Sequence, residues 1–230
     1  MKWIAVLSIA IGVGGAWGQD SQAVTDSNNR AVLELRQNHL AEAESLACQA
    51  LELARRVLPA KHPLAAVTLN NLAQVERFQQ RYLEAETHYR EAIAIWRESL
   101  GGAHPDTAKG LMNLAALYHD RGREGGAEDL YRQAAAIFES AYGKDNPLAL
   151  VARNELGEVL RAEHRFTESE KLSQATLDPL EHLLGDRDPR VVRALANRAR
   201  LLQETSRASE AAAVRARIPA LAQSFVGPKP

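Results

Sequence analysis

Apolar residues recur along most of the chain at three- and four-residue spacing, the pattern of a helix with one buried face. The segment 64–78 carries Val67, Leu72 and Val75 on such a face. The segment 82–100 does the same with Ala85, Tyr89, Ala92, Ile93 and Trp96. A polar stretch at 79–81 separates the two segments and is predicted to be a turn. The pattern therefore predicts an all-α protein built from paired helices.

A proline recurs every 42 residues, at Pro63, Pro105, Pro147 and Pro189. A glycine precedes the last three of these prolines by four residues, where it is suited to end a helix in the left-handed conformation. Proline is suited to the first turn of the next helix, because its missing N–H needs no partner there. The residues before the prolines are predicted to cap the helices or form the turn; they are His62, His104, Asn146 and Asp188.

Other positions follow the same 42-residue period. Glutamates recur at 44, 86, 128 and 170, and arginines at 81, 123, 165 and 207. The period divides the chain into five units, 24–63, 64–105, 106–147, 148–189 and 190–219. The outer units are less regular: Pro179 is expected to interrupt the second helix of unit four, and Arg198 replaces a leucine in unit five. A terminal unit whose outer face meets water can diverge in this way.

The two ends of the chain differ from the repeats. Lys2, the apolar run 4–13, and small residues Ala16 and Gly18 match the three parts of a secretory signal. We expect residues 1–18 to be a signal peptide cleaved after Gly18, with the protein exported to the periplasm or secreted; an uncleaved membrane anchor is the alternative. Residues 19–27 are expected to be a linker, 28–219 the repeat domain, and 220–230 a tail.

Composition and charge narrow the classes of function. The 230 residues are 46% hydrophobic and 25% charged, with a formal net charge of −1, which gives no basic excess for binding nucleic acid. Cys48 is the single cysteine, so no internal disulfide can form; it is expected to be a small buried residue, a reactive thiol being the alternative. No common catalytic motif is present, and no cofactor or metal site is expected.

The stretches LNNLAQVERFQQRYLEAETHYREAIAIWRESLGGAHPD at 69–106 and LMNLAALYHDRGREGGAEDLYRQAAAIFESAYGKDNP at 111–147 resemble the tetratricopeptide repeat, in the 42-residue variety of kinesin light chains and related bacterial proteins. The resemblance covers about residues 28–219. It implies a right-handed superhelical solenoid of antiparallel helix pairs, in which the first helix of each pair lines the concave face. It also implies a protein that binds a peptide or protein segment.

An asparagine column lies on the first helices, at Asn71, Asn113 and Asn197, with Asn29 in register. An Asn amide both donates and accepts, so it can pair with a peptide backbone; alternatively, these residues bond between neighbouring repeats. The predicted groove residues are Asn70, Asn71, Gln74, Arg77, Lys109, Asn113, Asn154, Arg161, Arg193 and Asn197. Their basic members would favour an acidic segment or a free carboxylate, whereas the alternative is a solvated face of mixed charge.

The preferred function is a non-catalytic interaction scaffold whose concave groove binds a peptide or protein. One alternative is an accessory subunit of an envelope enzyme or assembly complex. Another is a self-assembling structural protein, since solenoid ends can stack head to tail. Weak self-association is compatible with each of these functions.

Overall fold

The computed structural model describes residues 17–218, which form ten α-helices and no strand. The helices are α1 Trp17–Arg36, α2 Leu40–Val57, α3 Pro63–Phe78, α4 Tyr82–Ser99, α5 Pro105–Asp120, α6 Glu124–Tyr142, α7 Pro147–Ala162, α8 Phe166–Leu184, α9 Pro189–Glu204 and α10 Ala208–Ala216. None of these helices is long and apolar enough to cross a membrane.

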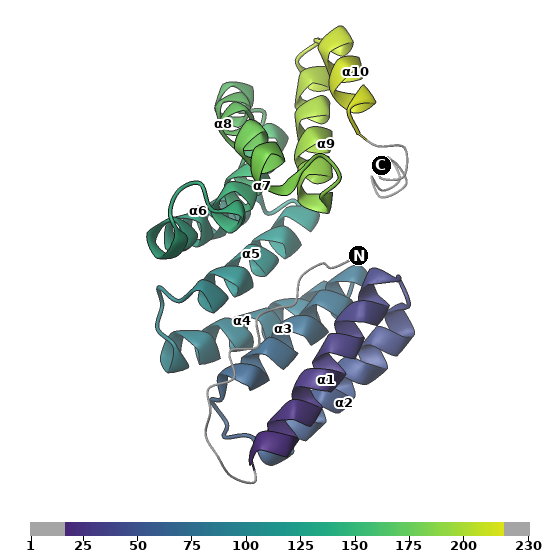
Figure 1. Cartoon of the computed structure of the whole chain (residues 1–230), viewed down its shortest axis with the longest axis vertical. Helices are drawn as coiled ribbons and strands as arrows, with labels where there is room; N and C mark the ends of the chain where they lie inside the picture. The colour runs from purple at the N-terminus through teal and green to yellow at the C-terminus, as the bar shows by residue number, and fades with distance from the viewer. Residues whose placement is uncertain (1–16, 219–230) are drawn as a thin grey trace.

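Consecutive helices pack as pairs, and the five pairs stack along the long axis of the molecule (Figure 1). Each first helix, from α3 to α9, packs against the second helix of the preceding pair. First helices also contact one another, α1 with α3, α3 with α5 and α7 with α9, so they form one face of the solenoid that is interrupted between α5 and α7. The all-α solenoid expected from the 42-residue period is therefore confirmed.

The boundary between pairs is built as the sequence predicts. Gly101, Gly143 and Gly185 have φ values of 98°, 90° and 78°, a region that favours glycine. The residue before each proline accepts a hydrogen bond from the backbone N–H two residues later. The acceptors are His62 Nδ1 (3.1 Å), His104 Nδ1 (3.1 Å), Asn146 Oδ1 (2.9 Å) and Asp188 Oδ1 (2.8 Å).

The turn within each pair follows the period too, as the polar stretch at 79–81 predicts, but the sequence pattern did not predict the left-handed residue in it. Residues Asn38, Gln80, Gly122, His164 and Ser206 all have φ between 59° and 66°. Three of them are residues that rarely adopt this conformation, so packing of the two helices imposes it on them. Residue type was therefore a poor guide to this turn.

The N-terminal unit begins earlier than predicted. Residues 19–27 form part of α1 and are not a linker: Val24 is fully buried, and Asn28 donates to Thr68 Oγ1 at 2.8 Å. These residues are helical because α1 packs against α3, and without α1 one side of α3 would be uncovered. Residues 1–16 of the predicted signal and the predicted tail 220–230 lie outside the described residues, whereas Trp17 and Gly18 begin α1.

Several local predictions are corrected. Helices α3, α5, α7 and α9 begin at the prolines, one residue before the predicted unit boundaries. Helix α8 continues through Pro179, because a proline removes only one helical hydrogen bond, here to the Ala175 carbonyl. Cys48 is exposed, since it lies on the outer side of α2. The thiol is nevertheless partly covered by its neighbours. This partial burial and the nearby Glu44 carboxylate raise the pKa of Cys48, so the thiol is not activated.

Large side chains of the second helices fill the spaces between pairs. Tyr89, Trp96, Tyr131 and Phe138 are each at most 3% exposed, as expected for packing between repeats, whereas Tyr142 is half exposed. These aromatics lie among small residues of the first helices, such as Ala115 and Ala152. The core is therefore a row of similar junctions, one between each two pairs.

Candidate binding surface

The face formed by the first helices carries all ten predicted groove residues, but not as one open row. Asn113 Nδ2 donates to Asn70 Oδ1 at 2.9 Å, and Asn71 Nδ2 donates to Asn28 Oδ1 at 3.4 Å. Each bond joins an asparagine of one repeat to an asparagine of the preceding repeat. In the first three repeats the geometry therefore matches the inter-repeat alternative, with these amides already engaged.

The ladder of asparagines stops between repeats three and four. Met112 and Glu155 occupy the positions that Asn70 and Asn113 hold one junction earlier. Helices α5 and α7 also lack the packing seen between the other first helices, and α7 instead packs closely on α6. The inner face is thus divided into an N-terminal part on α1, α3 and α5 and a C-terminal part on α7 and α9.

The C-terminal part brings four predicted residues together, Asn154, Arg161, Arg193 and Asn197. Asn154 and Asn197 are 5% and 6% exposed, and they do not form the bond that their register would allow. Asn197 Oδ1 accepts from Arg200 at 2.5 Å, while its Nδ2 has no partner among the described residues. An unpaired buried donor is costly, but this nitrogen is covered by its neighbours, so an incoming carbonyl would reach it only after those neighbours move.

The basic residues predicted for the groove are all paired with carboxylates. Their partners are Asp120 for Arg77 (3.4 Å), Asp106 for Lys109 (2.8 Å), Glu158 for Arg161 (2.9 Å) and Glu155 for Arg193 (2.9 Å). The Glu155 carboxylate raises the pKa of Arg193. Because these cations are neutralised within the chain, the predicted groove residues do not form a basic site for an acidic segment. They match the alternative, a solvated face of mixed charge.

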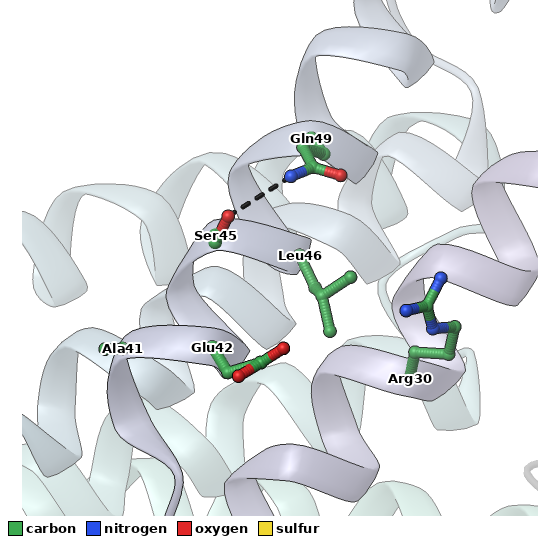
Figure 2. Close-up of a pocket in the computed structure, with 6 residues that line it drawn as sticks. All are labelled: Arg30, Ala41, Glu42, Ser45, Leu46 and Gln49. Atoms are coloured by element: carbon green, nitrogen blue, oxygen red, sulfur yellow. Dashed lines mark hydrogen bonds between the residues drawn. The ribbon is translucent and has the colours of Figure 1, made fainter.

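Two surface clefts lie on the N-terminal repeats. The larger, about 500 Å³, opens between α1 and α2 and is largely polar. There Glu42 and Leu46 of α2 face the helix that carries Arg30, and Gln49 donates to Ser45 (Figure 2). None of the predicted groove residues lines this cleft.

The smaller cleft, about 220 Å³, lies between α1 and α3 and is lined by Val32, Leu35, Arg36, Gln74 and Phe78. Gln74 was predicted, but the apolar residues were not. Phe78 is 51% exposed, and the Arg77 guanidinium lies over its ring, 5.3 Å from the centroid. The sequence did contain a signal for Phe78. The positions equivalent to Phe78 in repeats one, three and five hold the charged residues Arg36, Asp120 and Glu204, so a phenylalanine at this position is unusual.

A second ladder follows the turns within the pairs, and it joins the two periodic charge columns of the sequence. Each arginine of the turn within a pair bonds a glutamate on the second helix of the preceding pair. The pairs are Arg81–Glu44 (2.7 Å), Arg123–Glu86 (3.0 Å), Arg165–Glu128 (2.8 Å) and Arg207–Glu170 (2.5 Å). The constant separation of 37 residues between opposite charges was the signal for this pairing.

Five of the seven histidines have a hydrogen-bond partner in the described structure. Besides the capping residues His62 and His104, three histidines bond carboxylates: His39 with Glu34, His88 with Glu76 and His119 with Glu124. Residues 17–218 contain no group of three or more His, Cys, Asp or Glu side chains arranged to hold a metal ion.

Comparison with known proteins defines the class. The family model described as tetratricopeptide repeat matches residues 21–98, 64–140 and 147–214, so the chain belongs to the tetratricopeptide repeat family. Among solved structures, the chain is similar in fold to the nearly identical TPR-like repeats of a Podosopora anserina putative kinesin light chain, with a TM-score of 0.70. The two are 20% identical, and the match covers 87% of this chain and 94% of that chain.

Two further structures are similar in fold. BtubC (BKLC) from P. vanneervenii is 20% identical, with 93% of this chain and 92% of that chain covered and a TM-score of 0.69. The Rap conjugation gene regulator of plasmid pLS20, solved in complex with the Phr* peptide, is 13% identical over 96% of this chain, with a TM-score of 0.72. This chain spans 59% of the Rap protein. No curated protein matches the chain significantly.

Proposed function

We propose that this protein is a non-catalytic scaffold that binds a peptide or protein segment along the face formed by its first helices. The observation that carries the proposal is the cleft between α1 and α3, where the half-exposed Phe78 lies beside the Gln74 amide. An exposed aromatic ring in a concave cleft is characteristic of a site that takes an apolar side chain. The Rap protein in complex with its Phr* peptide is an example of a similar fold that binds a peptide.

The C-terminal part of the same face adds a second type of contact. The buried Asn197 Nδ2 group has no partner in the described chain, and Asn154 lies in the preceding repeat, 43 residues earlier. A peptide that displaces the side chains covering this donor would satisfy it with a backbone carbonyl, and the gain would not depend on the side chain the peptide carries. The apolar cleft would then confer the preference for one segment over another.

The test is site-specific photocrosslinking in cells that produce the protein. A photoreactive residue at position 78 is expected to capture one protein repeatedly, whereas one at Leu83, which is 70% exposed on α4, is not. Phe78→Glu is then expected to abolish capture by a crosslinker placed at Arg36, with Leu83→Glu as the matched control. Equal capture at both positions, or no effect of Phe78→Glu, would contradict the proposal.

We further propose that the protein acts after export, in the periplasm or outside the cell. The support is the N-terminal sequence: a basic residue, an apolar run at 4–13 and small residues at 16 and 18. Mass spectrometry of the mature N-terminus would test this, with Gln19 expected as the first residue. An intact N-terminus on cytoplasmic protein would contradict it. An accessory role in an envelope complex is compatible with the scaffold, and the captured protein would identify it.

A further inference from the structure

One junction of the arginine–glutamate ladder differs from the other three in its charge. At Glu86 three arginines surround a single carboxylate: Arg90 at 2.9 Å, Arg123 at 3.0 Å and Arg121 at 3.7 Å. Three guanidinium groups against one carboxylate leave a local charge of +2. This cluster, which we call the Arg90–Arg121–Arg123 cluster, lies on α4 and on the turn between α5 and α6.

The equivalent junctions carry the opposite excess. Two arginines, 132 and 165, meet three glutamates, 128, 163 and 168, at the next junction. Arg207 meets Glu170 and Glu210, and Arg81 meets Glu44 and Glu76. One junction in four is therefore positive, on a chain whose overall charge is −1.

The cluster is held in place and keeps hydrogen-bond donors for a ligand. The Tyr118 hydroxyl donates to Glu86 at 2.7 Å, and the Arg123 guanidinium lies 3.9 Å from the centroid of the Tyr118 ring. The Arg121 guanidinium makes no hydrogen bond in the described chain. The side chains of Arg90, Arg121 and Arg123 are 59%, 32% and 46% exposed, so their outer N–H groups face solvent.

Glu86 remains ionised and keeps the three cations together. Burial would raise the pKa of Glu86, but hydrogen bonds from Tyr118 and Arg90 and the charge of Arg123 outweigh it, and the pKa is lowered. The mutual repulsion of the guanidinium groups is thereby offset within the fold. A ligand would meet an array that is already assembled, which reduces the cost of binding.

We propose that the Arg90–Arg121–Arg123 cluster is a binding site for a phosphoryl group. A phosphoryl group carries a charge of about −1.5 to −2 at neutral pH and three acceptor oxygens, which matches the excess charge and the planar donors of the cluster. A single carboxylate would neutralise only part of that excess. The site lies on α4 and on the turn between α5 and α6 and shares no residue with the Phe78 cleft, so its test does not depend on the proposed peptide binding.

The experiment is a titration of the full-length, isotope-labelled chain with inorganic phosphate at low ionic strength, followed by backbone amide NMR. Amides of residues 121–123 are expected to shift saturably, while those of 163–165, at the equivalent position one repeat later, are not. Arg121→Glu is expected to weaken binding at least about tenfold. The chain itself carries Glu163 at the equivalent position, so the substitution is compatible with the fold.

A reciprocal variant makes the test sharper. Glu163→Arg combined with Glu168→Gln gives the next junction three arginines against the single carboxylate of Glu128, and is expected to create a second phosphate site, reported by amides 163–165. Equal shifts at both junctions of the wild-type chain, no saturable shift, or an unchanged affinity in Arg121→Glu would each overturn the proposal. Thermal unfolding of each variant checks that it is folded.

A second titration identifies the source of the phosphoryl group. The probes are a blocked Gly-Gly-phosphoserine-Gly-Gly peptide and its unphosphorylated form. Tighter binding of the phosphopeptide than of phosphate supports the site with a phosphorylated protein segment as its ligand. Binding of phosphate alone supports the site with the free ion as its ligand. Binding of both peptides with equal affinity would overturn the phosphoryl assignment.

Discussion

Asparagines of the inner face have two different roles, although each has another asparagine 43 residues away in a neighbouring repeat. Asn71 and Asn113 bond asparagines of the preceding repeat, whereas Asn154 and Asn197 remain apart. The first two contribute to stacking of the repeats, and the last two form no such bond between repeats. The inter-repeat interpretation of the asparagine column therefore applies to the first three repeats.

This division predicts different costs of substitution. Asn113→Ala removes a bond of 2.9 Å and leaves Asn70 Oδ1 without its donor, so we expect a loss of about 1 kcal/mol in the free energy of unfolding. Asn154→Ala breaks no such bond, and its effect is expected to be within about 0.5 kcal/mol. Urea unfolding of both variants measures the difference. Equal losses would mean that the inter-repeat bond contributes little.

The capping histidine His62 gives the stability a dependence on pH. Burial lowers the pKa of His62, and its Nδ1 must be neutral to accept from Leu64 N–H. Its contribution is therefore complete above about pH 6.5, the unfolded value, and is lost as the pH falls through the folded pKa.

Asn146 performs the same capping role without titrating, so His62→Asn is the informative variant. We expect stability equal to wild type at pH 8 and a gain of about 0.5–1 kcal/mol at pH 5. Thermal or urea unfolding at the two pH values measures it, and His182→Asn, which replaces an exposed histidine without a capping role, is the control. A gain that is the same at both pH values would show that titration of His62 is not the cause.

At the scale of helices, close approach is determined by small residues at particular positions. A Cβ atom at Gly110 of α5 would lie 2.8 Å from Ile93 Cγ1 and 2.9 Å from Trp96 Cζ3 of α4. At Gly125, near the start of α6, a Cβ atom would meet nothing within 4 Å. Close packing of α5 on α4 therefore requires a glycine at position 110, whereas no neighbouring atom requires one at position 125.

The two alanine variants are expected to change stability in opposite directions. Gly110→Ala forces the α4–α5 contact apart and should cost about 1–3 kcal/mol. Gly125→Ala should be neutral or stabilise by up to about 1 kcal/mol, because alanine loses less backbone entropy in a helix. Denaturant midpoints of the two variants provide the measurement. A stable Gly110→Ala variant would show that α4 and α5 can separate without cost.

At the scale of the whole molecule, the charge ladder also determines how the ends of the solenoid behave. The position one period before Arg81 holds His39, which bonds Glu34 of its own repeat. The position one period after Glu170 holds Ala212. Two copies placed head to tail would therefore lack the arginine–glutamate pair that joins every internal junction.

We accordingly expect the isolated chain to remain monomeric in concentration-dependent sedimentation. As a positive test, His39→Arg with Ala212→Glu supplies the missing pair and should increase self-association; either substitution alone should not. Filaments or larger species in the wild-type chain would contradict this expectation. Such a result would favour the self-assembling alternative over the scaffold.

The sequence by itself determined the features that depend on local chemistry and period. The 42-residue spacing of proline and glycine specified the pairs of helices, because these residues control where a helix begins and ends. The apolar faces specified which sides are buried. The caps at Asn146 and Asp188 followed from the same punctuation.

Only the tertiary structure decided how the polar residues are used. It assigned α1 to the first repeat, paired the arginine and glutamate columns, and neutralised the basic residues predicted for the groove. It also revealed the Phe78 cleft and the positive junction at Glu86. The physical reason is that a polar side chain is free or engaged according to its neighbours in space, and across a repeat junction these neighbours lie about one period away in sequence.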